Sequence, residues 1–123
     1  MRGWRRWKGG TLKRIYVAGK YSANNVLDVL KNIGRGEKAC AQLFSMGYAP
    51  FCPWHDKSYV TDMPDSDFTV DQFYRYSLAW LEVSDAVLLL PGWEQSKGTV
   101  AEIERADQLG IPVFKSIEEL PPI

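Results

Sequence analysis

The chain has 123 residues, 46% of them hydrophobic and 13% aromatic, and its 15 acidic side chains balance 15 basic ones. This length and composition predict one globular domain with its own core and exclude a disordered chain. No apolar run approaches the roughly 20 residues of a membrane span, and the basic N-terminus lacks the apolar segment of a secretory signal. The two cysteines, Cys40 and Cys52, lack metal-ligand spacing and are expected to stay reduced. We therefore expect a cytoplasmic protein without a metal or other cofactor.

The basic residues are distributed unevenly. Six of the 15 lie within the first 14 positions, together with Trp4 and Trp7, whereas the first acidic residue is Asp28. Residues 1–12 are therefore expected to form a basic N-terminal extension, and residues 13–123 the folded domain. Such an arm could contact nucleic acid by phosphate pairing and base stacking, but a solvated or packed extension is the favoured interpretation.

The first elements predicted are a strand and a helix. Residues 13–19, KRIYVAG, place β-branched, aromatic and apolar residues after two basic ones, which is typical of a short buried strand. After a polar loop, apolar residues recur at helical spacing over residues 26–44. Gly34 and Gly36 interrupt that series, so we expect the helix to break there or to begin only near Asn32.

The middle of the chain predicts a second strand and a second helix. Gly47 is a natural helix stop, and a short strand follows over residues 48–53, closed by a proline. Residues 54–66 are expected to be a long polar loop. A single inward-facing stripe then predicts a helix over residues 67–83. The sequence DAVLLL, residues 85–90, lacks alternation and indicates a central buried strand.

The last third predicts a helix that begins after Gly98 and ends at Gly110, a strand over residues 111–114 and a final turn over residues 116–120. Strands that alternate with helices indicate an α/β sandwich with a parallel sheet. Ligands of such sheets bind where the strands end. This rule predicts three loops on one rim, formed by residues 19–25, 52–66 and 91–97.

Glu102 is the residue that most needs an explanation. Thr99 and Glu102 fit a capping box, in which Thr99 is the N-cap and Glu102 returns a hydrogen bond to it. On a helical wheel, however, Glu102 lies between Ala106 and Leu109 on the apolar side of its helix. A cap does not require an inward position, and an idle inward carboxylate would be costly to desolvate. The position therefore favours a functional carboxylate.

The surrounding residues suit a nucleophile. A carboxylate in the first turn of a helix would be kept ionised by the helix dipole and nearby amides. It could attack an anomeric carbon that develops oxocarbenium character, as in retaining glycoside chemistry. Ser96, Lys97 and Gly98 offer a hydroxyl, a cation and helix-terminal amides, which outline an anion site.

Three segments of the chain then carry a family resemblance: YVAG…YSA near the start, WLEVSDAVLLLPGWEQSKGTVAEIERA, and LGIPVF. Together they resemble the nucleoside 2-deoxyribosyltransferase-like superfamily over roughly residues 15–114, and in particular a branch of small phage and bacterial proteins related to 2′-deoxynucleoside 5′-phosphate N-hydrolases. The resemblance implies a flavodoxin-like three-layer sandwich with a short parallel sheet of about four to five strands. It also implies cleavage or transfer of an N-glycosidic bond, and often an active site completed by a second subunit.

The resemblance implies particular roles for five positions. Glu102 matches the catalytic glutamate, and Gly98 the glycine four residues before it. Ser96 matches a serine that contacts the 5′-phosphate in the N-hydrolases. Gly19 and Tyr21 match the loop that lies against sugar and base. A further match, Asp85 at the start of the central strand, is expected to be structural.

One position departs from the family pattern. Eight residues before Asp85 the family commonly has an aspartate that positions the nucleophile or handles a proton, and this chain has Ser77. Either Asp71 or a group from residues 54–66 replaces it, or the site binds without catalysis.

Two further side chains are candidates for the site. His55 is the only histidine, which excludes a histidine triad, and it lies in a possible lid where a plain surface role is also expected. Trp93 could stack on a base, or instead anchor the packing at a subunit contact.

The sequence thus predicts an N-glycosidase or deoxyribosyltransferase that acts on a (deoxy)nucleoside 5′-monophosphate through Glu102, in a homo-oligomer of two or more subunits. One alternative is a non-catalytic nucleotide-binding or phage accessory module, which Ser77 favours. The other is a lysine-decarboxylase-like phosphoribohydrolase, whose PGG-x-GT-x-x-E motif is loosely similar to PGWEQSKGTVAE. The longer spacing between PG and GT in this chain counts against it.

Overall fold

The computed structural model describes residues 13–121, so the expected basic extension and its contacts lie outside the described residues. Four parallel strands form one sheet: β1 (Arg14–Ala18), β2 (Ala49–Phe51), β3 (Ala86–Leu89) and β4 (Val113–Phe114). Their order is β2-β1-β3-β4, with β1 and β3 in the centre. This is the flavodoxin-like strand order without a fifth strand, so the expected fold class is confirmed.

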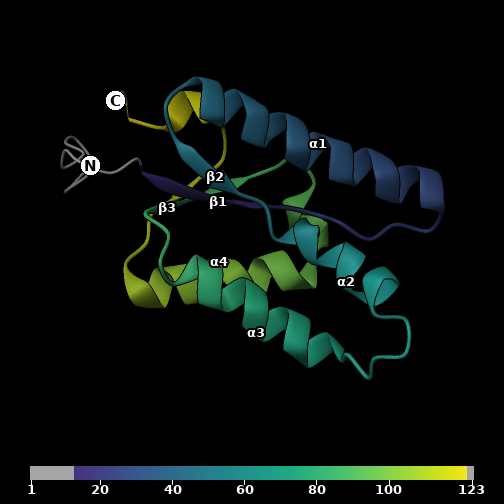
Figure 1. Ribbon diagram of the computed structural model, residues 1–123. Helices are drawn as coiled ribbons and strands as arrows, with labels where there is room; N and C mark the ends of the chain where they lie inside the picture. The colour runs from purple at the N-terminus through teal and green to yellow at the C-terminus, as the bar shows by residue number, and fades with distance from the viewer. Residues whose placement is uncertain (1–12, 122–123) are drawn as a thin grey trace.

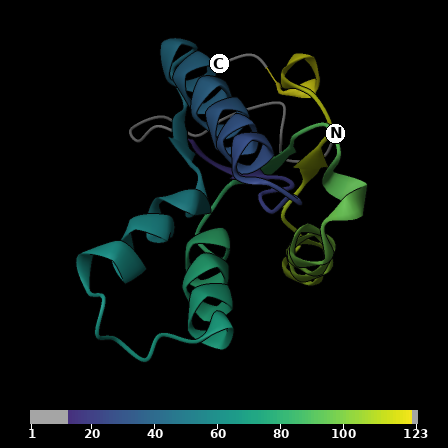
Figure 2. The ribbon, with the colours of Figure 1, turned by 90° about the vertical axis from the view of Figure 1, so that its right-hand side faces the viewer.

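Helices cover both faces of the sheet, which makes three layers (Figure 1). Helix α1 (Val26–Ser45) and the short turn η3 (Ile117–Glu119) lie on one face. Helices α3 (Val70–Leu81) and α4 (Lys97–Leu109) lie on the other, and α2 (Lys57–Asp62) projects beyond the sheet beside α3 (Figure 2).

Successive side chains of the central strands point to opposite faces of the sheet and so contribute to two cores. Ile15 and Val17 of β1 point toward α1, whereas Tyr16 and Ala18 point toward α3 and α4. All four are at most 1% exposed. The alternating residues of β3 divide between the two cores in the same way. This explains why the strands read as unbroken apolar runs, since both of their faces are covered.

Helix α1 is continuous, so the predicted break at Gly34 and Gly36 is wrong. Asn25 caps its first turn by accepting a hydrogen bond from the Asp28 amide at 2.9 Å. Gly34 faces open space, but a Cβ on Gly36 would stand 2.5 Å from the Trp54 ring and 3.0 Å from the Cys52 sulfur. Gly36 is therefore a close-packing residue and not a helix breaker.

Two other boundaries differ from the prediction. Residues 54–66 are not one polar loop, because the 3₁₀ turn η1 (Pro53–Asp56) and α2 occupy much of that segment. The last helix begins at Lys97 and not after Gly98, because its N-cap is Ser96. The Ser96 hydroxyl oxygen accepts hydrogen bonds from the Thr99 amide at 3.2 Å and the Thr99 hydroxyl at 3.0 Å. Thr99 is thus inside the helix, and the capping-box interpretation of Glu102 is wrong.

The two glycines of α1 form a matched pair for a stability test. Gly36→Ala should lower the free energy of unfolding by about 1–3 kcal/mol, because the Trp54 ring or the helix has to move. Gly34→Ala should raise it by about 0.5–1 kcal/mol, because alanine is the better helix former in open space. Chemical denaturation measures both, and equal effects of the two substitutions would contradict the close contact.

Candidate active site

A pocket of about 670 Å³ lies where β1, β2 and β3 end. All three predicted rim loops contribute to it, and α3 and α4 close its other side, as expected for the carboxyl ends of parallel strands. Its lining residues are Gly19, Tyr21, Ser22, Pro53, Trp54, Asp56, Val60, Val70, Phe73, Tyr74, Ser77, Gln95, Ser96, Lys97, Gly98, Thr99 and Glu102.

Glu102 lines the pocket, and a residue of the central strand β1 holds its carboxyl group by a hydrogen bond. The Tyr16 phenol, wholly buried in the central strand β1, donates a hydrogen bond to Glu102 Oε2. The Ser77 side chain of α3 hydrogen-bonds to the same tyrosine. Three elements that are distant in sequence thus meet at one carboxyl group through Ser77, Tyr16 and Glu102. Sequence reasoning missed Tyr16, although a tyrosine inside a buried strand needs a polar partner for its hydroxyl.

The ionisation of Glu102 differs from the expectation. Glu102 is the sixth residue of α4 and not in the first turn, so the free amides at the helix start are a turn away from it. Burial raises the pKa of Glu102 to about 7, while the hydrogen bond from Tyr16 acts to lower that pKa. The group is therefore poised to titrate near neutral pH, which is typical of catalytic carboxyl groups.

Tyr16 stays a hydrogen-bond donor. Burial, followed by the negative charge of Glu102, raises the pKa of the Tyr16 phenol well above its ordinary value of 10.0. The phenol therefore remains protonated at every pH at which the protein would work, and one carboxyl oxygen of Glu102 keeps a fixed partner. Glu102 itself lines the pocket.

The beginning of α4 lies at the same pocket. Ser96, Lys97 and Gly98 all line it, with Lys97 exposed and Ser96 half-buried. Ser96 already caps the helix, so its hydroxyl oxygen has an internal role besides any contact with a ligand. Gly98 lets the Tyr74 ring pack closely against the start of α4, since a Cβ at this position would stand 3.3 Å from that ring.

The loop after β1 is close-packed against the loop after β3. A Cβ on Gly19 would stand 2.9 Å from the Leu90 Cβ, which explains the glycine. The Lys20 ammonium donates to Gln95 Oε1 at 2.9 Å and so joins the two rims. Tyr21 lines the pocket, and its ring lies 5.7 Å from that of Trp54, centroid to centroid. Sequence reasoning did not single out Trp54 as a wall of the site.

Not all of the remaining candidate residues line the pocket. Trp93 packs in the core beside α4 and does not line the pocket, which argues against base stacking by this residue. Asp71 is exposed, forms an ion pair with Arg75 at 3.7 Å and does not line the pocket. Asp56 of η1 does line it. The backbone of His55 belongs to η1, but its side chain lies outside the described residues.

Asp85 has a structural position, as expected. Its carboxylate accepts a hydrogen bond from the Arg14 amide at 2.7 Å, and its own amide donates to the Arg14 carbonyl at 2.8 Å. It thereby joins the beginnings of β1 and β3, at the opposite end of the strands from the pocket.

Over residues 13–121 no group of three or more histidine, cysteine or acidic side chains is arranged to hold a metal ion. In the same part of the chain, none of the helices combines the length and the apolar character that crossing a bilayer requires.

Comparisons with known proteins agree with this architecture. A family model described as a domain of unknown function, DUF4406, matches residues 13–115. Among solved structures, a 2-deoxyribosyltransferase from the psychrotolerant bacterium Bacillus psychrosaccharolyticus matches with a TM-score of 0.57 and 20% sequence identity, over 81% of this chain and 69% of that one. No curated protein matches the chain. The likeness confirms the expected fold, that of a nucleoside 2-deoxyribosyltransferase.

The raised pKa of Glu102 predicts a specific pH dependence of stability. Between pH 4.5 and about 7 the folded chain retains a proton that the unfolded chain loses, so the free energy of unfolding falls as pH rises through this window. Glu102→Gln should abolish that fall and stabilise the protein above pH 7 by up to about 3 kcal/mol. Glu104→Gln, on the exposed face of the same helix, is the control and should retain it. Denaturant unfolding at several pH values measures the slope, and an unchanged slope in Glu102→Gln would contradict the shift.

Proposed function

We propose that this chain, which belongs to the DUF4406 family and has the fold of a nucleoside 2-deoxyribosyltransferase, cleaves or transfers the N-glycosidic bond of a (deoxy)nucleoside 5′-monophosphate. The observation that carries the proposal is the Glu102 carboxyl group, half-buried at the pocket and held by Tyr16. A half-buried carboxyl group with its own buried donor costs stability, as the raised pKa indicates, and a purely structural role would not require it.

In the proposed reaction, Glu102 attacks the anomeric carbon of the sugar. The bond from that carbon to the base nitrogen breaks, its electron pair stays on the base, and a bond to the free carboxylate oxygen forms. Water then releases the sugar, or a second base takes its place. Tyr16 fixes the other oxygen of Glu102, so that only one oxygen is oriented for attack. Ser77 supports Tyr16 and acts as a positioning residue.

The departing base needs a proton, and Ser77 is a poor donor because it is a hydroxyl in place of the usual carboxyl group. Of the two alternatives that the sequence offers, Asp71 is unsuited, because it is exposed and does not line the pocket. We assign the proton to Asp56, the other acidic side chain among the lining residues, which comes from the wall formed by η1. In the bound state its carboxyl group would lie within hydrogen-bond reach of the base.

Glu102→Gln tests the reaction directly. It keeps the shape and the hydrogen bond from Tyr16 but removes the nucleophile, so release of free base should fall by at least about 10²-fold, while Glu104→Gln retains the full rate. The measurement is chromatography of free base from a panel of nucleosides and their 5′-monophosphates. A wild-type chain that binds these compounds without releasing base would support the non-catalytic nucleotide-binding module instead.

The beginning of α4 supports the choice of a 5′-monophosphate. The Ser96 hydroxyl oxygen accepts the hydrogen bond of the Thr99 amide. The amides of Lys97 and Gly98, together with the positive end of the helix dipole, are then the groups that would bind an anion. The Lys97 ammonium adds a point charge at the same end of the pocket.

A matched pair of lysine variants tests the phosphate site. Charge-assisted contacts contribute roughly 1.5–3 kcal/mol each, so a 5′-monophosphate should bind at least about tenfold more tightly than its nucleoside. Lys97→Gln should reduce that preference, and Lys38→Gln, on the exposed side of α1, should not. Lys97 is preferred over Ser96 for this test, because Ser96→Ala also removes a helix cap. Calorimetry with matched compounds at low salt measures the preference, and equal affinity for both members of each pair would overturn the assignment.

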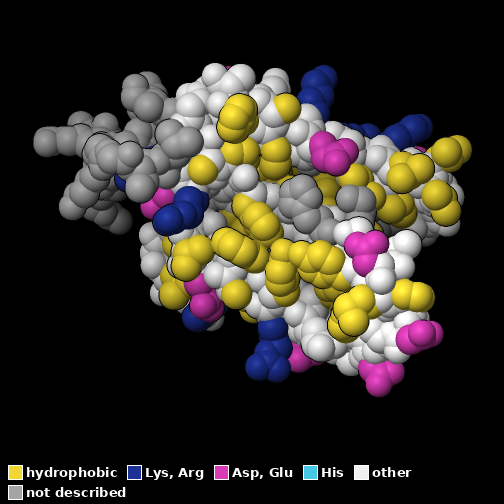
Figure 3. Space-filling model, viewed as in Figure 1, with side chains coloured by type: hydrophobic (Ala, Val, Ile, Leu, Met, Phe, Trp, Pro, Cys, Tyr) yellow, Lys and Arg dark blue, Asp and Glu magenta, His cyan; other side chains and the backbone are white. Residues whose placement is uncertain are grey.

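Self-association is the remaining part of the proposal. Large apolar side chains on α2, α3 and the segment between them are exposed, among them Val60 (49%), Met63 (59%) and Val70 (71%). Hydrophobic side chains gather along β2, α2 and α3 in Figure 3. Val60 and Val70 also line the pocket, so a second copy seated there would cover the apolar surface and border the site. Sedimentation at micromolar concentration should therefore give a dimer or larger, and a 14.0 kDa monomer would contradict this.

A further inference from the structure

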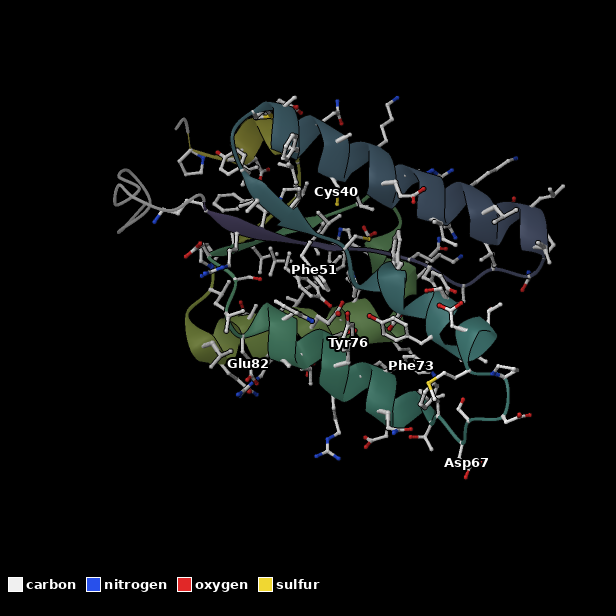
Figure 4. The ribbon with its side chains drawn as sticks, viewed as in Figure 1. Cys40, Phe51, Asp67, Phe73, Tyr76 and Glu82 are labelled. Carbon is white, nitrogen blue, oxygen red and sulfur yellow. The ribbon has the colours of Figure 1, made fainter. Side chains whose placement is uncertain are left out.

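Two thiols meet between α1 and β2, behind the wall of the pocket. Cys40 lies on the side of α1 that faces the sheet (Figure 4) and is half-buried. Cys52 follows the last residue of β2 and is 4% exposed. Their side chains hydrogen-bond to each other, although 12 positions separate them in the sequence. Neither thiol has a part in the proposed reaction.

The packing around Cys52 holds its sulfur against the helix. Gly36 is one turn before Cys40 on α1, and a Cβ at Gly36 would stand 3.0 Å from Cys52 Sγ. The absence of a side chain at Gly36 is what lets the sulfur approach the helix backbone, beside Cys40. From the other side, the Trp54 amide donates a hydrogen bond to the Cys52 sulfur. The sulfur is therefore fixed between α1 and the residues that form the pocket wall.

We propose that Cys40 and Cys52 form a reversible disulfide bond under oxidation by hydrogen peroxide, and that this bond reshapes the wall formed by Pro53, Trp54 and Asp56. Cys40 attacks the peroxide, the O–O bond breaks, and the products are a sulfenic acid on Cys40 and one water. The Cys52 sulfur then attacks the Cys40 sulfur and expels the hydroxyl group as a second water. In total, two thiols lose two hydrogens and one peroxide is reduced to two waters.

The two cysteines differ in exposure and in pKa, and both differences fit this order of events. Cys40 is the more accessible thiol, and the hydrogen bond from Cys52 lowers the pKa of Cys40. An exposed thiolate is the species that reacts with peroxide. The contact with Cys40, and then burial, raises the pKa of Cys52, so this thiol is protected from direct oxidation. Its position beside Cys40 is what places it to act on the sulfenic acid.

The link to the pocket follows from chain connectivity. Cys52 is followed directly by Pro53 and Trp54, and with Asp56 these residues line the pocket. The Trp54 ring already fills the space above Gly36, so a covalent bond that draws Cys52 toward α1 has to move the ring or the turn η1. The inference about the thiols stands without the proposed function, because it concerns the wall and not the chemistry inside the pocket.

The test uses the full chain, reduced and then treated with stoichiometric hydrogen peroxide. Intact mass spectrometry should record a loss of about 2 Da in the monomer, a peptide joining Cys40 to Cys52, and full reversal by dithiothreitol. Cys52→Ala should instead accumulate a sulfenic acid on Cys40 that dimedone traps, and Cys40→Ala should react at least about tenfold more slowly. Alanine fits both sites because a free cysteine packs as a small hydrophobe.

Nuclear magnetic resonance gives the second readout. The indole N–H signal of Trp54, assigned with Trp54→Phe, should shift on oxidation of the wild-type chain and stay in place in Cys40→Ala. A wild-type chain that retains two titratable thiols, links only to other copies, or collects further oxygens on Cys40 without a bridge would overturn the proposal. A disulfide that forms without moving the Trp54 signal would overturn the effect on the pocket wall.

Discussion

The hydrogen bond from the Tyr16 phenol to the Glu102 carboxyl group is the contact on which the site depends. It joins the central strand β1 to helix α4, and Ser77 extends it to α3. Tyr16 points toward these helices because β1 alternates between two cores, so the fold itself sets the direction of the donor. Without it, the half-buried Glu102 carboxyl group would lose the donor that supports its charge, and the cost of ionising it would rise.

Two effects act in opposite directions on the ionisation of that carboxyl group. Burial raises the pKa of Glu102 to about 7, which favours the neutral acid, whereas a nucleophile has to be ionised. The phenol of Tyr16 opposes burial, and the balance leaves both forms accessible near neutral pH. Burial also removes water from the carboxylate, which makes the ionised form more reactive when it is present. In the proposed function, the aromatic wall of Tyr21 and Trp54 would receive the base, and the polar start of α4 would receive the phosphate.

Much of this could be predicted from the sequence, because the strongest patterns come from elements whose burial is decided locally. The parallel sheet, the rim loops and the inward position of Glu102 all follow from periodicity and strand order. The errors arose where a contact distant in sequence decides the outcome. Gly36 reads as a helix breaker, and only the ring of Trp54 explains why a glycine stands there. Ser96 rather than Thr99 caps α4, and propensity alone does not choose between these two capping residues, which stand three positions apart. Tyr16 and its partner are 86 positions apart, so no local pattern connects them.

Burial and the hydrogen bond from Tyr16 act in opposite directions on the ionisation of Glu102, and one measurement tests this balance most directly. Carbon-13 nuclear magnetic resonance of the glutamate side-chain carboxyl groups, with Glu102 assigned from Glu102→Gln, follows its titration in the wild-type chain and in Tyr16→Phe. We expect a midpoint near pH 7 in the wild type, as burial dictates, and a higher midpoint in Tyr16→Phe, because the hydrogen bond that favours the charged form is lost. A midpoint near 4.5 that does not respond to Tyr16→Phe would contradict the account.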